Sequence, residues 1–247
     1  MGRIFKRLYS LIGFTLIAAG CGTPNGSSIG PANLDSLSAD QKTELGWAEK
    51  ACLQSEYGSD RGRVIRWAKS PTISAMNGDA AQKTALTAEI KEINRVLSTT
   101  PIQLIPVRDA DSSADIQVNF GPLAQMQALA SSMGANFDSG NEGIFWTWWN
   151  GNYEYTKTRI FMATDLIDPS KMGPLLLEEV GQSLGPQNDT PLYRDSITFE
   201  DENGSGFTPT LQARDEKLFH FLYNYTNPGD DQNTFDAAYV KNWNSIN

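Results

Sequence analysis

The stretch that decides the fold lies in the second half of the chain and reads Leu175-Leu176-Leu177-Glu178-Glu179-Val180-Gly181-Gln182-Ser183-Leu184-Gly185-Pro186. Its apolar residues recur at the spacing of one helix face, which predicts a buried helix over residues 175–185. The Gly-Pro pair stops the helix, because proline cannot continue it. Side chains four residues apart share a helix face, so Glu178 and Gln182 point the same way, with Glu179 beside them.

The rest of the domain predicts an alternation of helices and strands. Helical spacing is found over 40–56, 80–97 and 235–243, and strand patterns over 64–67, 71–74, 102–107, 115–120 and 159–163. This order predicts an α/β (α+β) domain built on a mixed twisted sheet. Residues 124–142 are interpreted as a loop that could cover a neighbouring cleft.

An aromatic segment precedes the helix, with Trp146 and Trp148 before an Asn-Gly pair at 150–151 and Tyr153 and Tyr155 after it. Asn-Gly between alternating aromatic runs predicts a hairpin with a two-residue turn, because both turn residues need positive φ. Such a turn would set Trp148 opposite Tyr153 and Trp146 opposite Tyr155. These candidate cleft residues could be core and its covering, or an exposed aromatic surface that binds a peptide or a sugar.

The helical stretch resembles the metzincin pattern H-E-x-x-H-x-x-G-x-x-H, with the glutamate at Glu179 and the glycine at Gly185. In that family three histidines bind zinc, and the glutamate polarises the zinc-bound water. Here the three ligand positions hold Glu178, Gln182 and Asn188, and the whole chain has one histidine. Neutral amides are weak zinc ligands, so we expect no cofactor, and zinc is disfavoured.

Other segments extend the resemblance over about residues 64–225. Residues 195–199 contain a Ser-Ile-Thr run that resembles the Met-turn, with Thr198 where Met usually lies, and 211–223 resembles the closing C-terminal helix. The chain is similar to a family of exported bacterial metzincin-like (matrixin-like) domains in which the histidines are often absent. The resemblance implies a mixed sheet with an active-site-type helix and a degenerate zinc site. His220, inside the closing helix, is interpreted as a core-edge or surface residue.

Four interpretations of the degenerate positions remain open. Glu178, Gln182 and Asn188 could hydrogen-bond to one another in place of a metal. Glu178 and Asp189 could instead help to bind calcium, or the site could be an atypical metallopeptidase in which Glu179 is catalytic. The fourth interpretation is a metal-free acid/base pair of Glu178 and Glu179, although adjacent helix residues point about 100° apart.

The N-terminus predicts export and lipidation. Residues 1–20 combine a basic start, a short apolar run and small residues, as in a secretory signal peptide. Ile17-Ala18-Ala19-Gly20-Cys21 resembles the bacterial lipobox, which implies a lipid on Cys21; an ordinary signal peptide with an incidental cysteine is the alternative. Residues 21–40 are then a flexible tether and 41–247 a single domain. Gly22 favours the outer membrane of the cell envelope.

Charge and cysteine content restrict the partners. The formal net charge of −9 becomes −12 without the signal peptide, which argues against nucleic acid and against anionic lipid surfaces. Once Cys21 is lipidated, Cys52 is the only cysteine left, so no internal disulfide can form. We expect Cys52 to be a small buried side chain.

These features predict a membrane-anchored lipoprotein with an inactive, metallopeptidase-like domain. Its cleft would bind an extended peptide or protein by strand addition, and its acidic helix favours a cationic or neutral ligand. One alternative is a metal-dependent peptidase with a non-histidine site around Glu178 and Glu179. Another is a purely structural envelope protein, which would show no ligand-dependent gain in thermal stability.

Overall fold

The computed structural model describes residues 32–55, 62–200 and 210–246. The expected signal peptide, the lipidation site Cys21 and the first part of the tether lie outside these residues. Within them, no helix combines the length and apolar character needed to cross a membrane.

The domain is built on a five-stranded mixed sheet with the strand order β2-β1-β3-β5-β4. The strands are β1 (Thr72–Met76), β2 (Ile105–Pro106), β3 (Ile116–Gly121), β4 (Gly143–Trp149) and β5 (Tyr155–Ala163). Strands β2, β1, β3 and β5 run parallel, whereas β4 pairs antiparallel with β5 at the edge of the sheet. The mixed α/β fold expected from the sequence is confirmed.

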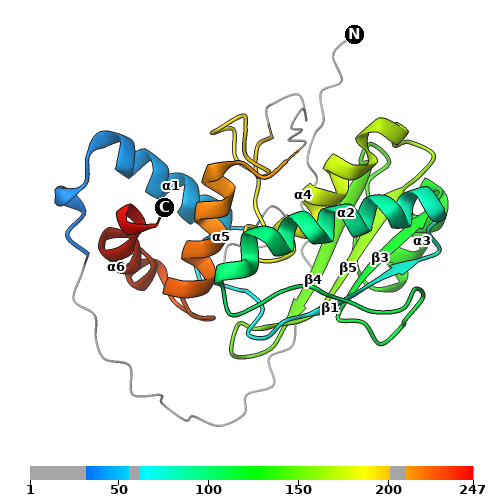
Figure 1. Ribbon diagram of the computed structural model, residues 1–247, viewed down its shortest axis with the longest axis horizontal. Coiled ribbons are helices and arrows are strands. Elements are labelled where there is room, and N and C mark those ends of the chain that lie inside the picture. The colour runs from blue at the N-terminus through cyan, green and yellow to red at the C-terminus, as the bar shows by residue number, and fades with distance from the viewer. Residues whose placement is uncertain (1–31, 56–61, 201–209, 247) are drawn as a thin grey trace.

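Helices lie on both faces of the sheet and beside it (Figure 1). The helices are α1 (Ala39–Leu53), α2 (Ala80–Val96), α3 (Leu123–Ser132), α4 (Met172–Gln182), α5 (Ala213–Tyr225) and α6 (Gln232–Asn242). Helices α2 and α4 pack on one face, α3 covers part of the other, and α1, α5 and α6 form a group at one end of the molecule. Short 3-10 turns occupy Leu34–Ser36, Leu97–Thr99, Pro169–Lys171 and Trp243–Ser245.

Two apolar clusters follow from the alternation of side chains along the strands. The main core lies on the α2/α4 face and includes Ile116, Val118 and Phe120 of β3. The second core lies under α3 and consists of Met126, Ala130, Ala135, Phe137, Ile144, Phe161 and Ala163. Because successive strand residues point to opposite faces, neighbours such as Ile160 and Phe161 belong to different clusters.

Local sequence fixes the helix ends. Ser38 and Asp79 form capping boxes, each accepting a hydrogen bond from the backbone N–H of a glutamine three residues later. The helices predicted over 40–56 and 80–97 are confirmed as α1 and α2. Helix α4 begins at Met172 and ends at Gln182, three residues earlier at each end than the predicted helix.

The two-residue hairpin turn is wrong. Strand β4 ends at Trp149, which pairs with Tyr155, while Trp148 pairs with Lys157 and Trp146 with Arg159. The backbone N–H of Asn150 reaches the Glu154 carbonyl, which closes a five-residue loop. The reason lies in the tertiary structure.

Residues 153–155 are used by another part of the chain. The N–H of Arg66 donates to the Tyr153 carbonyl, and the N–H of Tyr155 donates to the Arg66 carbonyl. Because residues 153–155 pair with Arg66, the chain pairs with β4 only from Tyr155 onward. Positive φ falls on Tyr153, at 62°, rather than on the Asn-Gly pair.

Residues 124–142 are not simply a loop, because they contain most of α3. Met126 and Ala130 pack on the sheet, and the first N–H of the helix, at Leu123, donates to Asp165 Oδ1 over 2.7 Å. The strand predicted over 102–107 is also shorter than expected, since only Ile105–Pro106 pairs with β1. Proline at the second position limits it to the edge of the sheet.

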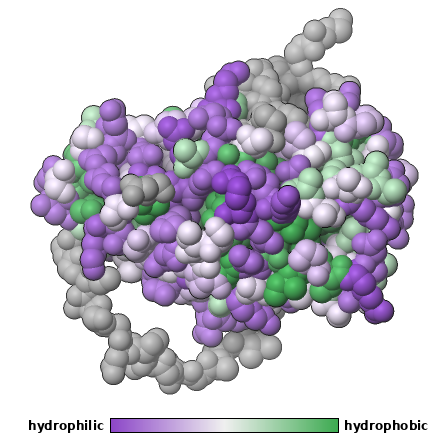
Figure 2. Space-filling view, viewed as in Figure 1, coloured by the Kyte–Doolittle hydropathy of each residue, from purple (hydrophilic) through white to green (hydrophobic). Residues whose placement is uncertain are grey.

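The molecular surface is largely polar. Figure 2 shows hydrophilic residues over most of one face, with the hydrophobic ones gathered mainly over the half that contains the sheet. Among the described residues, four large apolar side chains are exposed: Leu34, Ile105, Leu166 and Leu192. They come from separate elements.

Candidate functional site

The candidate site is built around the C-terminal half of α4 and the turn that follows it. Val180 and Leu184 are fully buried, so the helix face that carries them is fixed against the main core. Gly185 has φ 147°, a conformation that L side chains rarely adopt, and a Cβ there would collide with Leu222 of α5. The glycine therefore allows the chain to turn tightly under the end of the helix.

Gln182 is the hydrogen-bonding centre of the site. Its side chain is 4% exposed, and its Nε2 donates to Asp189 Oδ1 over 2.7 Å and to the Ile197 carbonyl over 2.9 Å. Both partners are acceptors, so the amide nitrogen must face them. In the metzincin pattern, the position of Gln182 holds a zinc ligand. Here the Gln182 amide nitrogen donates hydrogen bonds to other groups of the protein instead.

Asn188 holds a different part of the structure. Its side chain is 7% exposed and its Nδ2 donates to the carbonyl of Lys50 over 3.1 Å, while its backbone N–H donates to the carbonyl of Ala51. The residue therefore satisfies carbonyls at the C-terminal end of α1. The side-chain nitrogens of Gln182 and Asn188 therefore donate to other groups. The sequence had left open that these side chains hydrogen-bond to one another.

Glu179 lies where α4 approaches the edge strand. Its side chain is 7% exposed, and its Oε1 is so close to Gly143 that a Cβ added there would be 2.9 Å away. The first residue of β4 is thus a glycine in contact with a buried carboxylate. Glu178, next in the helix, is partly exposed.

A buried turn lies directly against α4. Residues Ser196, Ile197 and Thr198 are all almost fully buried, and a Cβ on Gly181 of α4 would meet Ile197 Cδ1 at 2.8 Å. The close approach of helix and turn therefore depends on a glycine in the helix. This turn is the Ser-Ile-Thr run that resembles the Met-turn in sequence.

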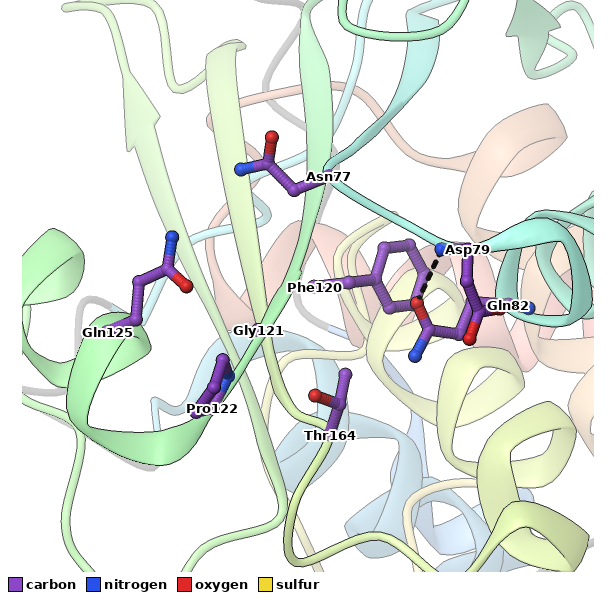
Figure 3. Close-up of a pocket in the computed structure, with 8 residues that line it drawn as sticks. All are labelled: Asn77, Asp79, Gln82, Phe120, Gly121, Pro122, Gln125 and Thr164. Carbon is purple, nitrogen blue, oxygen red and sulfur yellow. Dashed lines mark hydrogen bonds between the residues drawn. The ribbon is translucent and has the colours of Figure 1, made fainter.

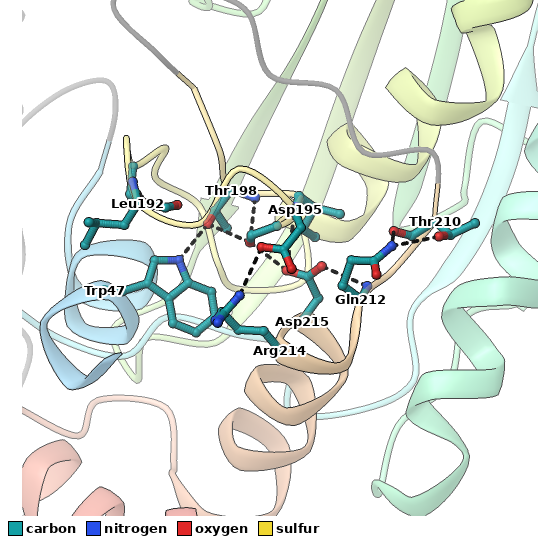
Figure 4. A network of polar contacts seen from close by, with 11 residues as sticks. Trp47, Leu192, Asp195, Thr198, Thr210, Gln212, Arg214 and Asp215 are labelled. Carbon is teal, nitrogen blue, oxygen red and sulfur yellow. Dashed lines mark hydrogen bonds and ion pairs between the residues drawn. The ribbon is translucent and has the colours of Figure 1, made fainter. Parts of the chain in front are cut away.

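Hydrogen bonds connect this turn to α1 and to α5 (Figure 4). Trp47 Nε1 of α1 donates to Thr198 Oγ1 over 3.0 Å. From α5, Asp215 Oδ1 accepts hydrogen bonds from Ser196 Oγ, at 2.6 Å, and from the Ile197 N–H. Burial raises the pKa of Asp215 to about 6, although these hydrogen bonds act in the opposite direction. Thr198 thus has a structural role at the position where the resembling family has methionine.

A cation covers the outer side of this network. The Arg214 guanidinium lies 3.6 Å from the centroid of the Tyr193 ring and donates to Asp195 Oδ1 over 3.0 Å. The Tyr193 ring in turn makes an edge contact with Trp47, at 5.5 Å between centroids. The contacts stabilise the 190–199 loop next to α4.

The structure separates the four aromatic candidate residues. Trp146 packs against the second core, under α3, and Trp148 alternates onto the same face with Lys157 Nζ 3.9 Å from its ring centroid. Both therefore point away from α4. Tyr155 is 4% exposed, packs on Trp67 and donates to Gln187 Oε1, while Tyr153 sits in the loop against Gly229.

The aromatic residues of β4 that do point towards α4 are Phe145 and Trp149, which pack against the main core. Sequence analysis did not choose them, because alternation alone does not tell which face of the strand a helix will cover. The bulge between Trp148 and Trp149 also shifts the register at the end of the strand. No feature of the local sequence predicts that bulge.

Arg66 was missed in the sequence. It is a buried cation whose guanidinium donates to the carbonyls of Trp67 and Thr226 and lies 5.0 Å from the Tyr223 ring centroid. Burial lowers the pKa of Arg66. Its Cβ would be 3.7 Å from a Cβ on Gly185, so Arg66 lies directly behind the turn that ends the candidate site.

Two other residues lie as expected. Cys52 is buried and free, and burial raises the pKa of its thiol. His220 is partly buried in α5 with its ring 5.8 Å from Tyr225, and its Nδ1 has no hydrogen-bond partner in the described part of the chain. It lies at the edge of the core.

The donor chemistry of the site does not fit zinc. Gln182 and Asn188 supply neutral amides, which can ligate a metal only through oxygen and are weak zinc ligands, and their nitrogens are part of the internal hydrogen bonding. In residues 32–55, 62–200 and 210–246, no three His, Cys, Asp or Glu side chains come together as a metal-binding group.

The sequence matches the family DUF2927, described as a protein of unknown function, over residues 49–227, and the chain therefore belongs to this family. No curated protein matches the sequence. Similar solved structures include two of myroilysin. One is 11% identical and covers 67% of this chain and 97% of that chain, with a TM-score of 0.39. The other is 12% identical and covers 76% and 98%, with the same TM-score.

Proposed function

We propose that this DUF2927 chain is a lipoprotein of the bacterial cell envelope, favouring the outer membrane, with a metzincin-like domain that lacks peptidase activity. The lipid on Cys21 anchors it, and the domain binds an extended peptide or a segment of another protein. The function is that of a binding module rather than of an enzyme.

The observation that carries the loss of activity is the hydrogen bonding of Gln182. Its amide nitrogen binds Asp189 and the Ile197 carbonyl, so the position of a zinc-binding imidazole is part of the internal framework. Without a bound metal, Glu179 has no acidified water to polarise, since bulk water has a pKa of ~15.7. The buried Glu179 then remains as an acidic side chain beside β4.

The edge strand supports peptide binding. Strand β4 lies at the end of the sheet, and within the described ranges no further strand pairs with its outer side. An open edge can accept an extended peptide through backbone hydrogen bonds. Glu179 lies at the start of this strand, so its carboxylate favours a peptide that is cationic or neutral there.

A selection experiment tests this function. A library of extended decapeptides is incubated with the protein, and retained peptides are identified by mass spectrometry together with any cleavage products. We expect intact peptides enriched in Lys and Arg. Hydrogen exchange should then slow at amides of residues 143–149 in the bound state. Slowing elsewhere, with β4 unchanged, would rule out strand addition.

The Glu179→Gln variant separates the binding module from a hydrolase. A binding module keeps its peptide, with some loss of affinity for the most basic sequences, whereas a hydrolase loses turnover. Glu142→Gln is the matched control, because this partly exposed carboxylate neighbours the same edge of the sheet. Cleaved peptides that become intact in the Glu179→Gln variant would show that the domain is an enzyme.

A further inference from the structure

A second site lies away from α4, at the carboxyl ends of the parallel strands. A pocket of about 300 Å³ opens there, lined by Asn77, Asp79, Gln82, Phe120, Gly121, Pro122, Gln125 and Thr164 (Figure 3). This volume is at the small end of the range for small-molecule sites, ~300–1,000 Å³. None of the lining residues belongs to the site around Gln182.

The topology places this pocket at a switch point of the sheet. From β1 the chain passes through α2 to β2, on one side of β1, whereas β3 lies on its other side and is followed by α3. Helix α2 belongs to the main-core face and α3 to the opposite face. In open α/β sheets, ligands bind where connections diverge in this way, outside the carboxyl ends of the strands.

The lining is rich in hydrogen-bonding groups that the protein does not use. The side chains of Asn77, Gln125 and Thr164 make no hydrogen bond to any other described residue. Gln82 uses its Oε1 to accept from the Asp79 N–H, at 2.8 Å. Figure 3 shows the carboxamides of Asn77 and Gln125 extending towards each other on one side of Gly121, with Gln82 on the other side.

Helix N-termini border the pocket, and one amide at the start of each helix is already bound. The Gln82 N–H donates to Asp79 Oδ1 at the start of α2, and the Leu123 N–H donates to Asp165 Oδ1 at the start of α3. The lining contains no Lys or Arg and one carboxylate. A phosphate or other anion would therefore find no counter-charge in the lining.

The backbone at the pocket is shaped for close approach. Asn77 directly follows β1 and has φ 60°, a left-handed conformation that asparagine tolerates better than most residues. At Gly121 a Cβ would be 2.8 Å from Gln125 Oε1 and 2.9 Å from Met126 Cε. A side chain there would push Gln125 out of place.

We propose that this pocket binds a neutral saccharide, as a single sugar ring or the end of an oligosaccharide. Carboxamides offer a donor and an acceptor side by side, which matches pairs of neighbouring hydroxyl groups. The groups come from three separate segments and surround a compact space, so a ring with hydroxyls around its rim engages them together. Asp79 accepts from a hydroxyl as readily as from an amide.

The test uses the full chain purified in a sugar-free zwitterionic detergent, with maltose, cellobiose and N,N′-diacetylchitobiose as probes. Saturation-transfer NMR is recorded with each sugar at up to ~10 mM, which detects millimolar affinity. We expect binding of at least one disaccharide. Gln125→Ala and Asn77→Gly should each weaken it about tenfold or more, since each removes hydrogen bonds to the ligand.

Both variants should fold, because Gln125 and Asn77 are exposed and glycine accepts the φ of Asn77. Gln103→Ala, at an exposed glutamine outside the pocket, is the matched control and should bind like the unmodified chain. The proposal is overturned if none of the three sugars binds. It is equally overturned if a sugar binds and neither pocket variant weakens it.

Discussion

Gln182 shows most clearly how single residues determine the character of this domain. Replacing it with alanine removes the donor from the buried Ile197 carbonyl and from the partly buried Asp189 carboxylate. A buried group left without its partner costs ~1–3 kcal/mol. We expect Gln182→Ala to lower the free energy of unfolding by about this amount, measured by urea denaturation.

The matched control is Gln103→Ala, at an exposed glutamine, which should change stability by less than ~0.5 kcal/mol. Gln182→His is also informative. An imidazole can donate one of these hydrogen bonds but not both, so it should be destabilising as well. If both Gln182 variants were as stable as the unmodified protein, the side chain would not be the structural centre proposed here.

Cys21 carries the anchoring prediction. With Cys21→Ser we expect the protein to lose incorporation of radiolabelled fatty acid and to leave the membrane fraction, because the acyl chains supply the membrane affinity. Labelling and fractionation of cells that express each form measure this. Cys52→Ser is the control. Cys52 is buried, so replacing it should leave lipidation unchanged. Membrane retention of unlabelled Cys21→Ser protein would contradict a lipid anchor.

At the scale of elements, α6 is held by aromatic packing that the sequence indicated through its four-residue spacing. Trp243 is almost fully buried, lies 5.4 Å from Phe221 and 4.7 Å from Tyr239 between ring centroids, and donates to Glu44. Trp243→Ala should cost ~3–5 kcal/mol and loosen α6 from α1 and α5. Thermal unfolding measures it, and Lys241→Ala, on the exposed side of the helix, should be near neutral. A small loss for Trp243→Ala would mean that α6 docks weakly.

Helices with strong local signals could be predicted, and elements that depend on distant contacts could not. The apolar spacing within residues 80–97 predicts α2 almost to the residue. The aromatic hairpin has an equally strong local signal and still failed, because Arg66 pairs with residues 153–155. Helix α3 was missed because its stabilising contact, the bond from Leu123 to Asp165, spans 42 residues.

The candidate site divides in the same way. The sequence predicted the helix and the turn at Gly185, because glycine and apolar spacing are local properties, and the resemblance selected the Ser-Ile-Thr run without predicting that it is buried. It did not predict that Gln182 binds Asp189, nor that Asp215 and Arg66 support the surrounding turns. Those contacts depend on how α1, α5 and the 190–199 loop meet.

At the scale of the whole molecule, buried and partly buried carboxyl groups affect how stability depends on pH. Burial and the interaction with Glu49 raise the pKa of Asp236 from 3.8 to about 7, and burial together with Glu92 raises that of Glu89 to about 7. Asp215 is raised to about 6. The folded protein therefore binds these protons more tightly than the unfolded chain.

It follows that the stabilisation from these groups is complete below about pH 4 and is lost as the pH rises through about 6 to 7. The net charge of −9 acts in the same direction, because repulsion grows as carboxyls ionise. We expect the melting temperature to fall between pH 5 and pH 8, and Asp236→Asn to flatten this dependence. A protein that melts higher at pH 8, or an Asp236→Asn profile parallel to the original, would contradict the assignment.

The most direct test is the metal content of purified residues 22–247, measured by plasma mass spectrometry after gel filtration without chelator. The zinc-binding positions of the resembling family are here Glu178, Gln182 and Asn188, and the amides of the last two are bound within the protein. We predict a folded protein with far less than one metal ion per chain. About one zinc per chain, lost on substitution of Glu178 or Asp189, would contradict the account and identify a working metal site.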